Sequence, residues 1–288
     1  MRFVRPSVPF LAIVCAICAS HARAQEKPQP SGYTLFNPAP DDQLRPLCTD
    51  RPGKGTSACT VDPGHLQIEI DAFDQSLNNQ GPIDTTTTLI GSPTIKLGVT
   101  ETADIEMTLV PYLSERVHDR ATGVRVNISG FGDLVLHGKF MLTGGGDGPF
   151  SAALDPFLKI PTADAGLGNG AVEGGLVVPL SYALSDVWSF GMTPEIDILH
   201  DVTGSGYHAS LTDVAGISRS LGELTLGAEV WGNFDFDPAG TVDAYSFDVT
   251  GTWQPPALHN FQIDGGVNFA LNRNVPRTQY YVGVSKLL

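Results

Sequence analysis

Residues 65–71 read His-Leu-Gln-Ile-Glu-Ile-Asp, and apolar and polar side chains alternate strictly along this stretch. In an extended strand, a period of two places Leu66, Ile68 and Ile70 on one face and the polar residues on the other. The same pattern recurs at 104–109, 133–140 and 261–269. No stretch after residue 24 shows a convincing 3.6-residue apolar period, which is the signature of an amphipathic helix. The sequence therefore predicts an all-β chain.

The alternation predicts twelve strands, separated by two kinds of connection. Their approximate spans are 64–74, 86–98, 101–112, 130–142, 150–160, 171–183, 187–200, 206–219, 222–236, 241–254, 258–271 and 279–288. Several connections after even-numbered strands are tight, whereas those at 75–85, 113–129 and 161–170 are longer. Short periplasmic turns and longer external loops are typical of outer-membrane proteins. We therefore expect a transmembrane antiparallel up-and-down β-barrel of about 12 strands.

A soluble β-sandwich would show the same alternation and is the main alternative. Ionisable groups recur on the polar face of nearly every strand, which favours a wet lumen over a buried sandwich core. Aromatic residues fall on the apolar face, many near strand ends, as the aromatic girdles of a barrel do. They are Trp188, Phe190, Phe234, Phe236, Tyr245, Phe247, Trp253, Phe261 and Phe269.

The composition excludes several classes of protein. The 288 residues carry a formal net charge of −14, whereas nucleic-acid binding needs a basic surface. A hydrophobic content of 42% argues against disorder as the main state. No apolar run reaches the roughly 18 residues of a spanning helix, so a membrane location would require a barrel.

The first 24 residues have the features of a cleaved signal peptide. Arg2 and Arg5 give a basic start, an apolar stretch follows at 8–19, and Ala22-Arg23-Ala24 suits signal peptidase. A short buried N-terminal helix is the alternative. We expect residues 1–24 to be removed, 25–63 to form a periplasmic segment, and 64–288 to form a barrel in the outer membrane of a Gram-negative cell. The expected partners are outer-membrane lipid, a small solute and, during biogenesis, the barrel assembly machinery.

Two cysteines, Cys48 and Cys59, lie in the N-terminal segment. In an oxidising compartment such a pair is expected to form a disulfide. A metal pair is the alternative, and His65 is the one nearby candidate for a further ligand. The sequence thus predicts a disulfide and no metal or cofactor.

Several motifs resemble a family of bacterial outer-membrane proteins. Their sequences are Thr-Asp-Arg-Pro at 49–52, Val-Asp-Pro-Gly-His at 61–65, Phe-Gly-Asp-Leu at 131–134, Pro-Phe-Leu-Lys-Ile-Pro-Thr at 156–162 and Asp-Gly-Gly-Val-Asn at 264–268. In this order they resemble proteins labelled "transporter" or "putative MetA-pathway of phenol degradation", over roughly residues 44–288. The resemblance implies an outer-membrane barrel that takes up small, in some cases aromatic, molecules. Such barrels usually end in an aromatic residue, whereas this chain ends in Leu288 and has Lys286 on the apolar row.

Candidate catalytic groups are few. His208 and Ser210 share one face of a strand, but no oxyanion element accompanies them. The glycine-rich stretch 166–170 lacks the lysine and following helix of a phosphate-binding loop. The sequence therefore predicts a channel for passive uptake of small solutes and no enzyme. A lipid or ester hydrolase barrel and a non-conducting structural barrel remain as alternatives.

The predicted inward rows are strongly acidic. They carry Glu69, Asp71, Asp104, Glu106, Asp133, Asp155, Glu173, Glu195, Asp197, Glu229, Asp248 and Asp264, against the bases Lys96, Lys139 and Lys159. Unpaired carboxylates in a narrow lumen require water, cations or another basic element. Arg45, Arg51 and Lys54 precede the first strand and could supply that element by folding back as a partial plug. We therefore expect a cation-preferring lumen, with strand eight the least certain register because Asp213 falls on its apolar row.

Overall fold

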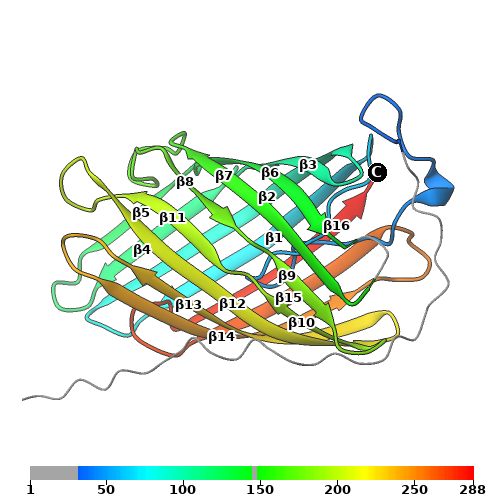
Figure 1. Cartoon of the computed structure of the whole chain (residues 1–288). Helices are drawn as coiled ribbons and strands as arrows, with labels where there is room; N and C mark the ends of the chain where they lie inside the picture. Colours follow the sequence, from blue (N-terminus) through cyan, green and yellow to red (C-terminus); the bar gives the residue numbers. More distant parts are fainter. Residues whose placement is uncertain (1–31, 145–147) are drawn as a thin grey trace, which may run out of the picture.

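The computed structural model describes residues 32–144 and 148–288, which form a closed antiparallel β-barrel (Figure 1). Four of the twelve barrel strands are interrupted, so sixteen segments are distinguished. Their bounds are β1 Leu66–Asn78, β2 Ile83–Thr100, β3 Ala103–Thr108, β4 Leu113–Asp119, β5 Arg125–Gly130, β6 Leu134–Thr143, β7 Phe150–Ile160, β8 Glu173–Val177, β9 Leu180–Ala183, β10 Trp188–Met192, β11 Glu195–His200, β12 Tyr207–Leu221, β13 Leu224–Asp235, β14 Val242–Trp253, β15 Phe261–Ala270 and β16 Thr278–Leu287. The predicted fold class is confirmed.

Strand β1 closes the barrel, because it pairs with β2 on one side and with β16 on the other. The second half of β2 pairs with β3 and its first half with β4, so β3 and β4 together make one barrel strand. In the same way β5 with β6, β8 with β9, and β10 with β11 each form one barrel strand. The predicted signal peptide, residues 1–24, lies outside the described residues.

Prolines mark three of the four interruptions. Pro111 lies between β3 and β4, Pro179 between β8 and β9, and Pro194 between β10 and β11. A proline has no N–H to donate to the ladder, which therefore breaks there. Neighbouring strands stay joined through the proline carbonyls: Val178 N donates to Pro194 O at 2.8 Å and Ala153 N to Pro179 O at 3.0 Å.

Two of the long loops expected from the sequence are wrong. Most of 113–129 is strand, since β4 and β5 pair from Leu113 opposite Gly130 to His118 opposite Arg125. Likewise β1 and β2 extend to Asn78 and Ile83, which leaves a short turn in place of the predicted loop 75–85. The polar character of these stretches suggested loops, but a threonine row at 85–88 of β2 supplies cross-strand partners for both neighbours.

The two faces of the sheet are the reverse of those in a soluble protein. Apolar side chains are exposed on the outside, among them Ile105 at 53%, Ile198 at 50% and Val230 at 49%. The largest fully buried side chains, by contrast, include Lys139, Asp104 and Asp248, which face the lumen. An apolar exterior and a polar interior are the pattern of a membrane barrel.

Asp213 and Lys286, the two charged residues that the sequence puts on apolar rows, do face outward. Asp213 lies on the outward row of β12, and the register with β13 runs unbroken through it, so no bulge turns it inward. It lies opposite the interruption at Thr193–Pro194 in the neighbouring strand. Lys286 lies on the outward row of β16, and its ammonium donates to the carbonyl of His259 at 2.7 Å.

One end of the barrel holds the N-terminal segment and the C-terminus. Leu288 exchanges backbone hydrogen bonds with Leu66 there, and Thr34 bridges to Thr100 at the turn after β2. The one helix among the described residues is a short 3-10 turn, η1, at Asp41–Gln43. No helix in the described ranges is long and apolar enough to cross a membrane.

Candidate functional site: the lumen and the N-terminal segment

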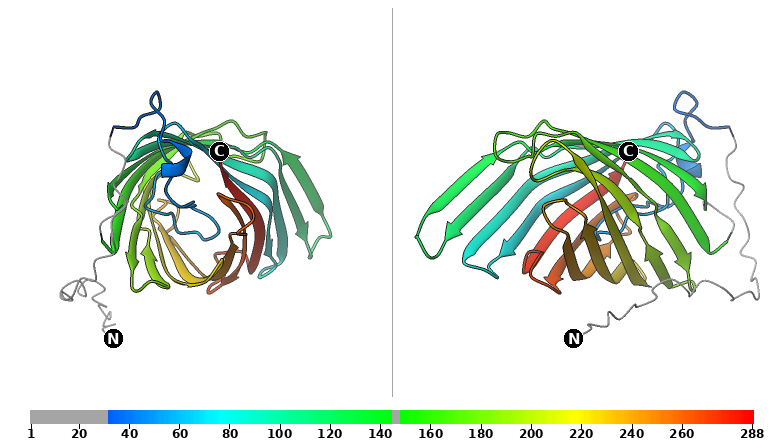
Figure 2. Two further views of the ribbon diagram at one scale, coloured as in Figure 1. Left: turned by 90° about the vertical axis from the view of Figure 1, so that its right-hand side faces the viewer. Right: turned by 60° about the vertical axis from the view of Figure 1, so that its left-hand side comes forward.

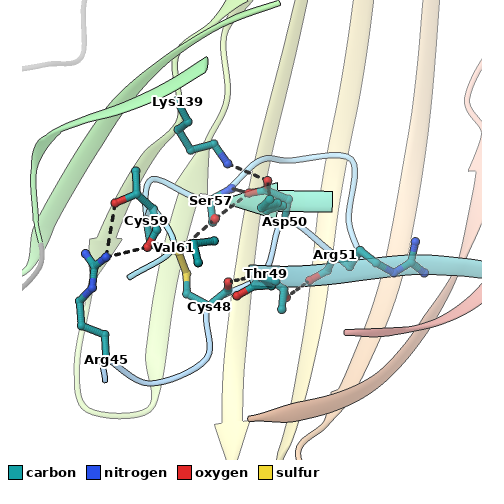
Figure 3. The surroundings of a disulfide bond; sticks show 12 residues. Arg45, Cys48, Thr49, Asp50, Arg51, Ser57, Cys59, Val61 and Lys139 are labelled. Atoms are coloured by element: carbon teal, nitrogen blue, oxygen red, sulfur yellow. Dashed lines mark hydrogen bonds and ion pairs between the residues drawn. A yellow bond between two sulfur atoms is a disulfide. The ribbon is translucent and has the colours of Figure 1, made fainter. Parts of the chain in front are cut away.

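Residues 44–63 run into the barrel, where the view along its axis shows them inside the ring of strands (Figure 2, left). Cys48 and Cys59 are joined by a disulfide at the base of this loop (Figure 3). Its tip, residues 50–56, contacts inward-facing side chains of several strands. We call residues 44–63 the luminal segment.

Asp50 of the luminal segment lies between two buried lysines of the wall (Figure 3). Its carboxylate accepts from Lys139 Nζ at 2.7 Å and from Lys96, and it also accepts the Ser57 N–H at 2.8 Å. Burial alone raises the pKa of Asp50, but the two ammonium groups outweigh it and hold that pKa well below its usual range. The segment thus contributes an acid that neutralises wall bases.

The same two lysines contact wall carboxylates. Lys96 Nζ lies 2.8 Å from Glu69, and Lys139 Nζ lies 3.0 Å from Glu106. Glu69 in turn accepts the backbone N–H groups of Asp50 and Arg51. Acids and bases are therefore buried as pairs, which offsets the cost of removing each charge from water. The same pairs attach the luminal segment to the wall.

Arg51 reaches the opposite side of this cluster. Its guanidinium pairs with Asp71 of β1 and with Asp264 of β15, the latter at 2.8 Å. It also lies 6.0 Å from the ring centre of Tyr281. Two strands far apart in sequence are therefore joined through one segment side chain.

Lys54 extends the contacts to β13 and β14. Its ammonium donates to Ser246 at 2.8 Å, lies 3.7 Å from Asp248 and sits 4.5 Å from the ring centre of Trp231. Its backbone N–H donates to Glu229 at 2.5 Å. The adjacent Gly53 lies close to the same carboxylate, and an added Cβ there would lie 2.6 Å from it, so the Glu229 side chain would have to shift.

Arg45 does not reach the barrel wall. It pairs with Asp62 within the segment at 2.6 Å and donates to the Thr60 carbonyl at 2.9 Å. The sequence predicted that Arg45, like Arg51 and Lys54, would face the lumen acids, because a loop sequence does not indicate which of its bases point inward. The pair braces the two arms of the luminal segment.

Lys159 lies apart from the segment. It bonds Glu173 at 2.7 Å and lies 3.5 Å from Asp133, which is in the break between β5 and β6. Asp104, nearer the segment, accepts the Val61 N–H at 2.8 Å.

A group of carboxylates on β7 and β11 has few basic partners. Asp155 lies 3.2 Å from Nδ1 of His137, while Glu195 and Asp197 have no lysine or arginine within 4.0 Å among the described residues. Both face the lumen one residue apart along β11.

A vestibule of about 330 Å³ opens beyond the tip of the segment. Its lining combines the charged groups at the tip with Asp155, His137, Gln279 and Tyr281. The sequence analysis missed Tyr281 and Trp231 as lumen residues, although Trp231 shares the odd-numbered row of β13 with Glu229 and could have been found from that register.

The histidine considered for catalysis is otherwise engaged. His208 lies 2.8 Å from Asp201 and 2.7 Å from Asp235, whereas Ser210 accepts from Asn233 at 2.7 Å. No His208–Ser210 hydrogen bond exists among the described residues. Among the described residues, one group could hold a cation: the ligand atoms of Asp201, His208 and Asp237 lie within 4.8 Å of one another. The two ring nitrogens of His208, however, face separate carboxylates, those of Asp201 and Asp235.

Comparisons with known proteins agree with this architecture. A family model described as "Putative MetA-pathway of phenol degradation" matches residues 49–286. An outer membrane channel from Pseudomonas putida F1 is 14% identical, with 83% of this chain and 99% of that chain covered at a TM-score of 0.64. None of the curated proteins compared matches the sequence.

Two further solved structures are more distant. The β domain of the Bordetella autotransporter BrkA is 12% identical, with 78% of this chain and 99% of that chain covered at a TM-score of 0.48. The P. putida toluene transporter TodX is 8% identical, with 77% and 87% covered at a TM-score of 0.37. These scores are too low to support an argument. The P. putida F1 channel, together with the apolar exterior, shows the fold of an outer-membrane barrel.

Proposed function

The chain belongs to the family described as "Putative MetA-pathway of phenol degradation", and on that premise we propose that it is a passive outer-membrane channel for small solutes. The observation that carries the proposal is the polar, cavity-containing interior of a barrel with an apolar exterior. The lumen of a purely structural barrel could be filled with apolar side chains, and such a barrel would not need so many buried ions. Family membership also favours aromatic compounds among the solutes.

We propose further that the channel prefers cations. Five bases face the lumen, Lys96, Lys139, Lys159, Arg51 and Lys54, against the twelve wall carboxylates named above and Asp50. Acids therefore remain in excess even after the luminal segment has contributed its bases. A fixed negative surplus in a confined, wet passage raises the local concentration of cations.

The luminal segment is proposed to act as a partial plug. Support comes from its ion pairs with β1, β2, β6, β14 and β15, which fix it across the lumen. Its position leaves the vestibule on one side and the C-terminus on the other. The barrel assembly machinery is a proposed partner during insertion.

Catalysis is not part of the proposal. A lipid hydrolase would need a nucleophile beside its base, whereas Ser210 and His208 bond to different partners. A barrel that inserts but passes no current would support the structural alternative.

Purified protein in planar bilayers tests the channel function. Stepwise conductance is expected, with a reversal potential under a KCl gradient that has the sign of K⁺ preference. Swelling of proteoliposomes against sugars, amino acids and aromatic acids would then rank the solutes. Absence of current from a folded, inserted barrel would contradict the proposal, and anion preference would contradict its acidic-lumen component.

A further inference from the structure

The luminal segment leaves one wall of the barrel largely free. Its ion pairs all go to β1, β2, β6, β14 and β15, whereas β9, β10 and β12 receive none of them. Its one side-chain anchor on that side is neutral, the hydrogen bond from Thr56 N to Thr193 Oγ1 at 3.2 Å.

Small hydroxyl side chains line this free wall. Ser151 of β7 lies opposite Ser181 of β9, and Ser189 of β10 lies opposite Ser218 of β12. The hydroxyls of Ser189 and Ser218 are 2.7 Å apart and exposed to the lumen. We call these four residues the serine wall.

Two cavities separate the luminal segment from the serine wall. One of about 220 Å³ lies between residues 49–57 and strands β9, β10, β12 and β13. The other, of about 570 Å³, lies toward the end that holds the C-terminus. Both are lined by Ser181, Ser189 and Ser218, so they adjoin each other.

The smaller cavity also adjoins the vestibule. Asp50, Arg51, Gly53 and Thr56 line both of them. These shared residues all belong to the tip of the segment, so the vestibule and the smaller cavity lie on either side of it. The two cavities along the serine wall would form a side passage from the tip to the end of the barrel that holds the C-terminus, apart from the ion-paired side of the lumen.

The passage is lined by hydroxyl, glycine and apolar residues. Thr49, Thr56 and Ser57 face it from the segment, while serines and glycines lie on the wall beside apolar residues such as Leu180 and Val214. The ionised groups that border it are already occupied: Asp50 by lysines, Arg51 by aspartates, Glu229 by the Lys54 N–H, and Arg45 and Asp62 by each other. A hydroxyl both donates and accepts, so this lining can replace the water around an uncharged polar solute, but it offers no counter-charge to an ion.

We propose that solutes cross the barrel through this passage with the luminal segment in place, and that the serine wall is a binding constriction for small uncharged solutes that carry hydroxyl groups. This route rests on the proposed channel function. The carboxylates of β11 enrich cations at the entrance, and the serine wall sorts solutes by width and hydrogen bonding further along.

Modification of a single cysteine in the assembled full-length channel tests the route. Ser218→Cys places a thiol on the serine wall, while Cys48 and Cys59 are held in their disulfide and Cys15 and Cys18 lie in the signal peptide that is expected to be removed. Thr108→Cys is the matched control, because Thr108 lines the vestibule and neither of the two cavities along the serine wall. Labelling follows folding, so a change in current cannot come from failure to assemble.

Benzyl methanethiosulfonate should lower the conductance of the Ser218→Cys channel by about twofold or more, since a pore conducts according to its narrowest width. The smaller methyl reagent should have a weaker effect, and Thr108→Cys should change little with either. Unchanged conductance after complete labelling of Cys at 218 would overturn the route. The route would also be overturned if the channel conducted but the reagent did not label the cysteine at position 218. A wild-type barrel that never conducts would instead overturn the channel function itself.

The solute class has its own readout in proteoliposome swelling. Xylitol should enter faster than xylonate, an anion of similar size, and Ser189→Ala with Ser218→Ala should slow xylitol while leaving the passage open. Equal rates for xylitol in the variant and the wild type would contradict binding by the serine wall.

Discussion

At the scale of single residues, the central feature is the Asp50 carboxylate between Lys96 and Lys139. The two buried ammonium groups, on β2 and on β6 to either side of β3, would repel each other without it, and Glu69 and Glu106 already share them. The wall bases were predicted from their inward register. Asp50 was not, because a loop has no period from which its direction can be inferred.

Asp50→Asn should loosen the luminal segment without unfolding the barrel. A hydrogen bond to a charged group contributes about 1.5–3 kcal/mol, and a fifth of the Asp50 side chain is exposed, which places the loss toward the lower figure. Faster tryptic cleavage after Lys54 would report the loosening. Asp41→Asn, on the exposed η1 turn, is the control and should cleave like the wild type.

The depressed pKa of Asp50 gives this contact a defined pH dependence. A carboxyl whose pKa is lowered on folding stabilises the docked state at every pH above its ordinary value, and loses that effect only as the pH falls through the lowered pKa. Trypsin is inactive in acid, so pepsin protection of residues 45–60 is the suitable measurement. Protection that disappears already near about pH 5 would show that another group controls docking.

The facing of β11 can be tested with adjacent residues. Ile196 is 45% exposed on the outer face, whereas Glu195 faces the lumen near Asp155 and Asp197. Ile196→Arg should cost about 2–4 kcal/mol near the bilayer midplane, while an arginine at Glu195 finds carboxylate partners. The heat-modifiable folded band on gels should fall for Ile196→Arg and persist for Glu195→Arg. Equal yields would show that the strand is not embedded as described.

At the scale of elements, the disulfide and the Arg45–Asp62 pair both act within the luminal segment. Neither bridges to a strand, since β1 begins only at Leu66. The loop between Cys48 and Cys59 is therefore a preformed unit that docks into the barrel, and the barrel's own ladder does not depend on it.

Cys48→Ser with Cys59→Ser should leave the barrel folded. A loop of eleven residues contributes about 2–3 kcal/mol in the chain-entropy model, and that stabilisation is local to the segment. The folded band should persist on gels while protection of the segment from protease decreases. Loss of the folded band would mean that the segment nucleates the barrel.

The sequence was sufficient for the strands that cross the membrane but not for the rest. Where one face meets lipid and the other water, as along β13 to β16, the period of two is strict and the predicted spans lie close to those observed. At β4 and β5 the pattern fails because polar residues occupy both faces. The path of the luminal segment depends on contacts with residues about 200 positions away, such as Arg51 with Asp264, which no local pattern encodes.

At the scale of the whole molecule, the luminal segment is ion-paired to one side of the lumen only. Small hydroxyl side chains face it across a gap on the other side. A complete plug would need complementary packing on every side, and the cavities of about 220 and 570 Å³ show that the other side lacks it. We therefore expect a channel that is narrowed, not closed.

The most direct test of this account is the single-channel conductance of the full-length barrel compared with a variant that lacks residues 25–60. The account predicts small, stable, cation-selective steps for the full chain, because solutes pass beside the luminal segment. It predicts larger steps for the deletion, because the lumen is then open across its width. Equal conductance of the two proteins would contradict an account in which the luminal segment narrows the pore.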